Sequence, residues 1–338
     1  MVARKGLTLL FGWVKLSDVE IRRLGETGVV VSRIGLGLAA LGRPVYIDVG
    51  RDRDLGNERT RAAMEGRCHE VLDAAYAAGI RYVDAARSYG EAEAFLADWL
   101  ETGDRPGLVV GSKWGYTYVG GWRLDAHVQE VKDLSAAALR RQIAESRRLL
   151  GDRLSLYQIH SSTIESGVFD DQEVLDELRS LRGTGLLLGF STSGPKQADA
   201  IARGIEERVD GEPLFSTVQS TWNVLEPSAG PALAEAHAEG LGVLIKEAMA
   251  NGRLAVPEGP LGRLAGGLGT TPDRVALATA LAHPWVDVVL SGAVTVDQVR
   301  SNAAAVDLTL PADALSELEG FAQPPQRYWT DRAALPWR

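Results

Sequence analysis

Short apolar runs alternate with longer segments of helical period along most of the chain. Apolar residues at helical spacing indicate helices, whereas short apolar runs bounded by glycine or polar residues indicate buried strands. Counting from residues 34–39, eight such strands alternate with helices. This alternation predicts parallel strands joined by right-handed crossovers and therefore a (β/α)8 barrel. A doubly wound sheet is disfavoured because Gly35 and Gly37 are followed neither by a third glycine nor by a helix.

The bounds of the predicted barrel elements follow from these runs. The strands are predicted at 34–39, 82–83, 108–113, 154–159, 186–190, 216–219, 242–245 and 286–290. The helices are predicted at 68–78, 92–100, 135–150, 172–181, 196–207, 232–239, 272–283 and 296–304. A β-hairpin (19–24 with 29–32) precedes the barrel, and a tail from 311 to 338 adds one helix. We expect an N-terminal extension, 1–18, and a single domain, 19–338.

Two segments lack a clear period. The polar segment 43–61 is predicted to be a loop, and it is placed to cover the mouth of the barrel. The segment 114–122 is predicted to be a loop rich in tryptophan and tyrosine. Aromatic residues at a barrel mouth can bind sugars or flat apolar groups, and they can equally serve to pack the loop.

Composition narrows the functional classes. The chain has 338 residues, 45% of them hydrophobic and 24% charged, which is ordinary for a globular enzyme. A net charge of −9 without a dense basic cluster argues against nucleic-acid binding. The single cysteine, Cys68, excludes an internal disulfide and fits a reducing compartment. The apolar run 7–13 is too short to span a membrane, so we expect a cytoplasmic protein. The sequence indicates no metal site.

Titratable side chains gather where the predicted strands end. Asp84, Lys113 and His160 follow or close the second, third and fourth strands, and Tyr89 lies in the loop after Asp84. In a barrel these strand ends meet around one mouth, where active sites form. Each residue alone has a plain alternative, namely a helix cap for Asp84, a solvated strand end for Lys113 and a core histidine for His160. Their joint occurrence at one face favours a catalytic site.

These four side chains suit proton donation to a carbonyl oxygen. The pKa of tyrosine in water is about 10, so a nearby lysine is expected to lower the pKa of Tyr89. Asp84 would keep Lys113 charged, and His160 would orient the substrate oxygen. Because no side chain can supply a hydride, the reaction requires a cofactor.

The chain resembles the aldo-keto reductases from residue 19 to about 305. The resemblance rests on segments that include AGIRYVDAARSYGEAE (78–93), LGDRLSLYQIH (150–160), GLLLGFSTS (185–193), GLGVLIKEAMANGRL (240–254) and SGAVTVDQVRSN (291–302). It implies reduction of an aldehyde or ketone, a sugar or secondary metabolite included, with Tyr89 as general acid. Asp84 and Lys113 would be its partners, and His160 would orient the substrate.

The resemblance also implies a set of cofactor-binding residues. They are Ser191, Thr192, Gln219, Lys246, Glu247, Met249, Arg253, Gly292, Thr295, Gln298 and Asn302. Lys246 stands where the family usually has an aromatic residue that stacks on the nicotinamide, and Gln298 stands where many members have an arginine for the 2′-phosphate. NADPH is mildly favoured, and NADH is possible.

Two other functions remain open. A Schiff-base aldolase would use Lys113 or Lys246 as its nucleophile. A cofactor-binding redox sensor or accessory subunit would bind NADP tightly with little turnover. We expect a small-molecule carbonyl substrate and neither a nucleic-acid nor a membrane partner.

Overall fold

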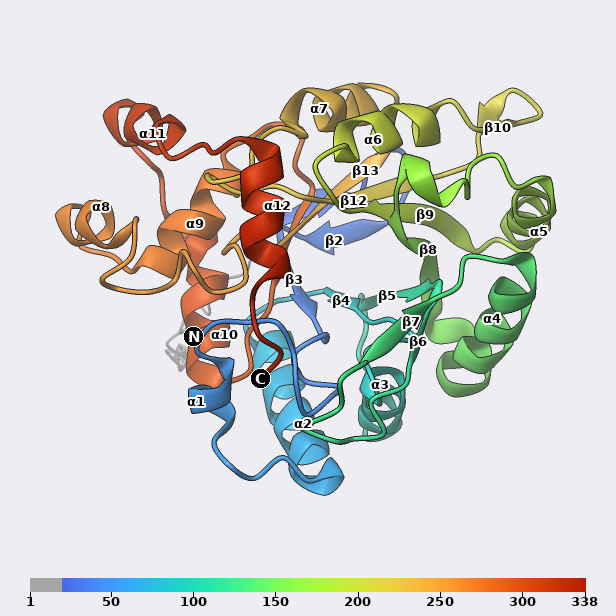
Figure 1. Cartoon of the computed structure of the whole chain (residues 1–338), viewed down its shortest axis with the longest axis horizontal. Coiled ribbons are helices and arrows are strands. Elements are labelled where there is room, and N and C mark those ends of the chain that lie inside the picture. The colour runs from blue at the N-terminus through green and yellow to red at the C-terminus, as the bar shows by residue number, and fades with distance from the viewer. Residues whose placement is uncertain (1–19) are drawn as a thin grey trace, which may run out of the picture.

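The computed structural model describes residues 20–338, and Figure 1 shows helices surrounding a ring of strands. The proposed extension 1–18, with its apolar run 7–13, lies outside the described residues. Eight parallel strands form a closed barrel, which confirms the predicted fold. In spatial order they are β12 (Thr217–Thr221), β13 (Gly242–Lys246), β14 (Val288–Ser291), β3 (Ile34–Gly37), β4 (Tyr82–Asp84), β5 (Val109–Trp114), β8 (Leu154–Ser162) and β9 (Leu187–Thr192).

Helices connect the strands outside the barrel. They are α2 (Arg61–Ala77), α3 (Ala92–Glu101), α4 (Ala136–Leu150), α5 (Gln172–Arg182), α6 (Gln197–Ile205), α7 (Gly230–Ala238), α8 (Gly262–Gly267), α9 (Pro272–Leu281) and α10 (Val296–Ala303). Helix α2 begins seven residues before the predicted start, because Thr60 caps it by accepting a hydrogen bond from the Ala63 amide. The predicted helices therefore all form, with shifted ends.

The predicted hairpin closes the N-terminal end of the barrel. Strands β1 (Ile21–Arg23) and β2 (Val30–Ser32) pair antiparallel. Leu24 and Val31 pack in one cluster with the barrel side chains Tyr82 and Leu244. A Cβ atom on Gly25 would lie 2.4 Å from the Gly242 nitrogen, so only glycine allows this close approach. The hairpin thus leaves the opposite end of the barrel as the open one.

The predictions for two connecting segments and for the C-terminal tail were wrong, and one small hairpin was not predicted at all. The segment 43–61 contains a short helix, α1 (Arg51–Leu55), and the aromatic segment opens a hairpin, β6 (Tyr116–Tyr118) with β7 (Glu130–Lys132). A second small hairpin, β10 (Arg208–Val209) with β11 (Glu212–Pro213), follows α6. The tail holds two helices rather than one, α11 (Ala312–Glu319) and α12 (Pro325–Ala333). Figure 1 shows α12, in red, in front of the barrel. Within residues 20–338, no helix combines the length and apolar character needed to cross a bilayer.

Candidate active site

Asp84 and Lys113 form a buried ion pair across neighbouring strands. The register aligns Asp84 of β4 with Gly111 of β5, which places Lys113 close to it. Lys113 Nζ bonds Asp84 Oδ2 and also donates to the Ala85 carbonyl at 2.9 Å. Their side chains are only 1% and 3% exposed. Lys113 is therefore not a solvated strand end, and its charge is largely directed at Asp84.

Neutral donors surround the other oxygen of Asp84. Oδ1 accepts hydrogen bonds from Gln219 Nε2 at 3.1 Å and from the Tyr82 hydroxyl at 3.3 Å. Gln158 Nε2 lies 3.4 Å from the same oxygen. Gln219, which the resemblance assigned to the cofactor, thus contacts the Asp84 carboxylate. Tyr82 and Gln158 were missed, although their places on β4 and β8, flanking the catalytic residues, could have suggested them.

Tyr89 and His160 face each other at the open end of the barrel. Their ring centroids are 5.5 Å apart, and Lys113 Nζ lies 4.9 Å from the Tyr89 ring centroid. Tyr116 packs against the other side of His160 at 5.0 Å. Tyr89 and His160 line, with Asp84, a cavity of about 380 Å³, a size typical of small-molecule sites. The four side chains singled out in the sequence therefore lie together.

The electrostatics of Tyr89 differ from the prediction. Burial and the negative charge of Asp84 raise the pKa of Tyr89 well above its usual range, with Arg43 acting against them. The pKa of Tyr89 is therefore not lowered as predicted in the protein without ligands, because burial and Asp84 dominate and Lys113 is itself paired with Asp84. Tyr89 therefore holds its proton firmly at neutral pH.

His160 carries no charge at neutral pH. Burial lowers the pKa of His160 well below its usual range, and the charges of Lys113 and Lys246 add to this effect. Ser88 Oγ lies 3.5 Å from His160 Nδ1. A neutral imidazole can donate one hydrogen bond to a substrate oxygen without adding charge.

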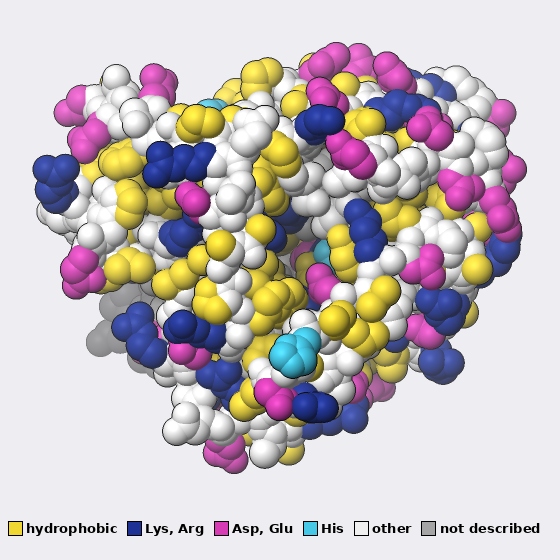
Figure 2. Space-filling view, in the orientation of Figure 1, with side chains coloured by type: hydrophobic (Ala, Val, Ile, Leu, Met, Phe, Trp, Pro, Cys, Tyr) yellow, Lys and Arg dark blue, Asp and Glu magenta, His cyan; other side chains and the backbone are white. Residues whose placement is uncertain are grey.

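The space-filling view shows the hollow at the centre of this face, with charged side chains inside it (Figure 2). Its walls contain residues that the sequence did not single out, namely Arg43, Tyr46, Asp48, Glu130, Asn251, Arg332 and Trp337. They come from the segment 43–61, from β7, from the turn after β13 and from the C-terminal tail. No local pattern marks them, because they meet only when these segments fold over the barrel.

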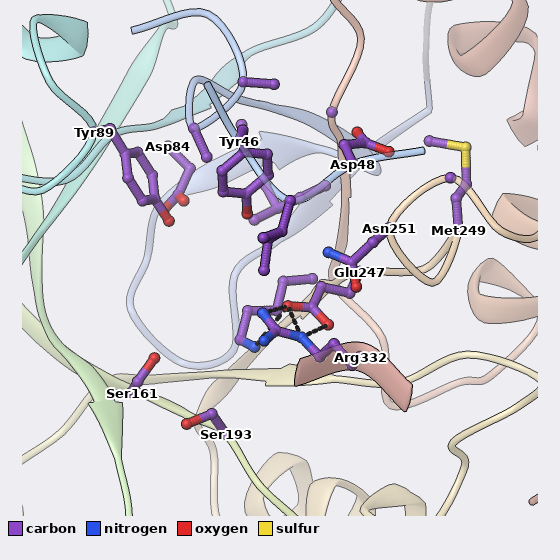
Figure 3. Close-up of a pocket in the computed structure, with 18 of the residues that line it drawn as sticks. Tyr46, Asp48, Asp84, Tyr89, Ser161, Ser193, Glu247, Met249, Asn251 and Arg332 are labelled. Carbon is purple, nitrogen blue, oxygen red and sulfur yellow. Dashed lines mark hydrogen bonds and ion pairs between the residues drawn. The ribbon is translucent and has the colours of Figure 1, made fainter. Parts of the chain in front are cut away.

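Lys246, at the end of β13, donates to Thr221 Oγ1 at 2.8 Å and lies 3.7 Å from Glu247. Arg332 of α12 binds both carboxylate oxygens of Glu247, with Nε 2.8 Å from Oε2 (Figure 3). Burial lowers the pKa of Lys246 to about 8. Burial alone would raise the pKa of Glu247, but Arg332 and Lys246 lower it to about 2. The position to which the resemblance assigns an aromatic residue thus holds part of a buried cation–anion–cation cluster.

The turn after β13 is held in an unusual conformation. Glu247, Ala250 and Asn251 have φ angles of 57°, 49° and 56°, in the left-handed region that non-glycine residues rarely adopt. Asn223 Nδ2 fixes the turn by donating to the Glu247 carbonyl at 2.9 Å. Asn251 Oδ1 is buried, lacks a hydrogen-bond partner among the described residues, and belongs to a cavity-lining side chain. Such an orphaned group fits a site that binds a polar ligand.

The proposed cofactor residues occupy different places. Gln219, Lys246, Glu247, Met249 and Gly292 line the catalytic cavity. A second cavity of about 330 Å³ adjoins it and is lined by Gln298 and Asn302, and also by Met249 and Gly292.

Four other proposed residues do not line either cavity. Ser191 and Thr192 are buried in β9, where Ser191 Oγ accepts from the Ser161 amide at 2.8 Å. Thr295 caps α10, and the Arg253 guanidinium lies 4.7 Å from the Tyr328 ring centroid.

The model of the Aldo/keto reductase family matches residues 34–323 of this chain. Three relatives are similar along most of their length. Protein tas of Escherichia coli is 24% identical, over 90% of this chain and 98% of its own. L-galactose dehydrogenase of Arabidopsis thaliana is 26% identical, over 91% and 96%. The NADH-specific methylglyoxal reductase of E. coli is 24% identical, over 86% and 95%.

Solved structures agree with the fold. An aldo-keto reductase from Bacillus halodurans in its holo form has a TM-score of 0.69 at 24% identity, covering 90% of this chain and 97% of that one. A putative aldo-keto reductase from Pseudomonas aeruginosa has a TM-score of 0.63 at 26% identity, covering 89% and 98%.

Proposed function

Because the chain belongs to the aldo-keto reductase family, we propose that it reduces an aldehyde or ketone to an alcohol with a nicotinamide cofactor, using Tyr89 as the general acid. The observation that carries this proposal is the meeting of Tyr89, His160 and the Asp84–Lys113 pair at one cavity. Oxidoreductases among the relatives support the class of reaction.

The residues of the chain would divide the work as follows. Bound NAD(P)H supplies the hydride, which no side chain can provide. His160, neutral and facing Tyr89, donates a hydrogen bond that orients the carbonyl oxygen. Tyr89 gives its proton to that oxygen as negative charge develops there. Lys113, at 4.9 Å from the ring centroid, stabilises the tyrosinate left behind, and Asp84 holds Lys113 in place.

The polar groups in the cavity wall favour a polar carbonyl substrate. The wall carries Arg43, Glu130 and Tyr116 as well as Tyr89, groups that can bond hydroxyl or second carbonyl oxygens. Two relatives are named for such compounds, L-galactose and methylglyoxal. We therefore propose a sugar or a short oxo-aldehyde rather than an apolar aldehyde.

The test follows NADH or NADPH absorbance with methylglyoxal, aldoses and benzaldehyde as substrates, for the wild type and for Tyr89→Phe. We expect turnover of a polar substrate and a loss of about 10²- to 10⁴-fold in kcat for Tyr89→Phe. The dissociation constant of the cofactor, from fluorescence titration, should stay unchanged. Full activity in Tyr89→Phe would refute the assignment of the acid. Tight cofactor binding without turnover of any substrate would favour the sensor function instead.

Lys246 is the residue that could act as the nucleophile of a Schiff-base enzyme, the second candidate function. It lines the cavity, and its pKa of about 8 leaves part of it uncharged at neutral pH, as an amine nucleophile requires. Lys113 is fully buried and bonded to Asp84. Borohydride treatment in the presence of methylglyoxal, followed by mass spectrometry, should leave Lys246 unmodified if hydride transfer from the cofactor is the reaction.

A further inference from the structure

The second cavity continues the catalytic one. The two share Asp48, Met249, Gly252 and Gly292 in their walls. The second cavity lies at the start of α10, where Val294 and Gln298 line it. A dinucleotide with its reactive ring beside Tyr89 would extend through this junction and place its adenosine half in the second cavity. The inference below rests on the proposed function, because it assumes that a nicotinamide dinucleotide binds in this way.

The charges in the second cavity are mostly negative. Its walls contain four carboxylates, those of Asp48, Asp54, Asp273 and Asp297. Burial raises the pKa of Asp48 to about 7, so this one is partly protonated at neutral pH. The cavity as a whole therefore presents negative charge where adenosine would bind.

Arg51 is the sole cation among the described residues that line the second cavity. Its guanidinium is 2% exposed and donates to backbone carbonyl oxygens, which are those of Ala40, Arg43, Pro44 and Arg338. Because these contacts occupy Nε, Nη1 and Nη2, Arg51 is tied to the backbone and is not free to bind a phosphate. Arg300, on α10, does not line the cavity and is paired with Asp297 at 3.4 Å.

Asp54 and Gln298 form a direct link across the second cavity. Gln298 Nε2 donates to Asp54 Oδ2 at 2.7 Å, and Gln298 Oε1 accepts from the Val294 amide at 2.8 Å. Gln298 is thus fixed at both ends. The resemblance places the 2′-phosphate next to residue 298. Through its hydrogen bond, Gln298 therefore keeps the carboxylate of Asp54, a residue of α1, close to that place.

We propose that this protein selects NADH over NADPH, and that Asp54, held by Gln298, is the residue that excludes the 2′-phosphate. A phosphate on the 2′-oxygen would bring nearly two negative charges into a cavity where Arg51, the one lining cation among residues 20–338, is already bound to backbone carbonyl oxygens. A 2′-hydroxyl, in contrast, can donate a hydrogen bond to a carboxylate, as dinucleotide sites of other folds do with Asp or Glu. This proposal departs from the mild preference for NADPH drawn from the sequence.

The test is a fluorescence titration of the full-length protein with NADH and with NADPH, in the absence of substrate, together with kcat/KM for both. We expect the wild type to bind NADH about tenfold or more tightly than NADPH. Asp54→Asn should reduce the ratio of the NADPH dissociation constant to the NADH dissociation constant several-fold, by improving the affinity for NADPH. Adding Gln298→Arg should narrow it further, because it supplies a partner for the phosphate.

The matched control is Asp52→Asn, which removes the same charge from the same helix at a residue outside both cavities. It should leave the ratio of dissociation constants unchanged. Because the exclusion is electrostatic, raising the salt concentration should weaken the discrimination in the wild type and much less in Asp54→Asn. Equal affinity of the wild type for both coenzymes, or equal ratios in Asp54→Asn and Asp52→Asn, would overturn the inference. Binding of neither coenzyme would instead overturn the proposed function.

Discussion

The candidate site spans the two adjoining cavities, and its two ends are built in different ways. At one end, Asp84 and Lys113 belong to adjacent strands, and their meeting follows from the register of the barrel. At the other end, Glu247 is bound by Arg332 of the C-terminal helix, and Gln298 is bound by Asp54 of the segment 43–61. The end proposed to be catalytic is therefore positioned by the barrel itself, whereas the end proposed to bind the cofactor is positioned by segments added around it. The residues at the first end fit the motifs on which the family resemblance rests, whereas Lys246 and Gln298 at the second end depart from the usual residues that the resemblance implies.

The largest expected effect comes from breaking the buried pair at the catalytic end. Asp84→Asn leaves the charge of Lys113 buried without an anion. We expect the free energy of unfolding to fall by about 3–5 kcal/mol, measured by urea denaturation, with most of the turnover lost.

The double variant Asp84→Asn with Lys113→Met sharpens this prediction. Removing both charges should recover part of the lost stability, because no unpaired charge remains buried. Turnover should stay low in both variants. A double variant no more stable than Asp84→Asn alone would show that the pair is not the source of the loss.

The second prediction concerns the corresponding pair at the cofactor end. Arg332→Met leaves Glu247 buried without its main partner, and we expect a loss of about 2–3 kcal/mol at neutral pH. The pKa of Glu247 is lowered from 4.5 to about 2 in the folded protein, so its contribution is fully present above pH 4.5. It should disappear as the pH falls towards 2, and the difference between wild type and variant should shrink over that range.

Arg327→Met is the matched control for Arg332→Met. Arg327 lies on the same helix in an exposed pair with Asp331 at 3.9 Å, and such pairs contribute less than about 1 kcal/mol. If the free energy of unfolding falls equally little in Arg332→Met and in Arg327→Met, α12 is not anchored through Glu247. Cofactor affinity should also fall in Arg332→Met alone, since Arg332 and Glu247 line the cavity.

The contrast between the two ends also explains what the sequence could predict. Asp84, Lys113 and His160 each belong to or directly follow an apolar run, so the barrel prediction places them together. Helix α1 within 43–61 was missed because five residues, four of them charged, carry no apolar period. Arg332 and Asp54 were missed because their partners lie 85 and 244 residues away, and no local pattern records such contacts. The raised pKa of Tyr89 depends on burial, which the sequence does not show.

The smallest expected effect tests the lysine that replaces the family's aromatic residue. The pKa of Lys246 is lowered from 10.5 to about 8 by burial, so the folded protein loses this proton before the unfolded chain does. Between pH 8 and 10.5 the unfolded chain binds more protons, and the contribution of Lys246 to stability therefore rises with pH. Relative to Lys246→Met, we expect the wild type to gain about 1–2 kcal/mol over this range, measured by urea denaturation at pH 7.5 and 10.

Lys196→Met is the control for Lys246→Met, because Lys196 is exposed and its pKa is raised by Glu165 rather than lowered. The wild type should show no such gain relative to this variant. If Lys246→Met and Lys196→Met give the same pH dependence, Lys246 is solvated in the folded protein and its charge is not held in the cavity. A gain confined to the comparison with Lys246→Met would show that Lys246 is a buried, titratable cation in the folded protein.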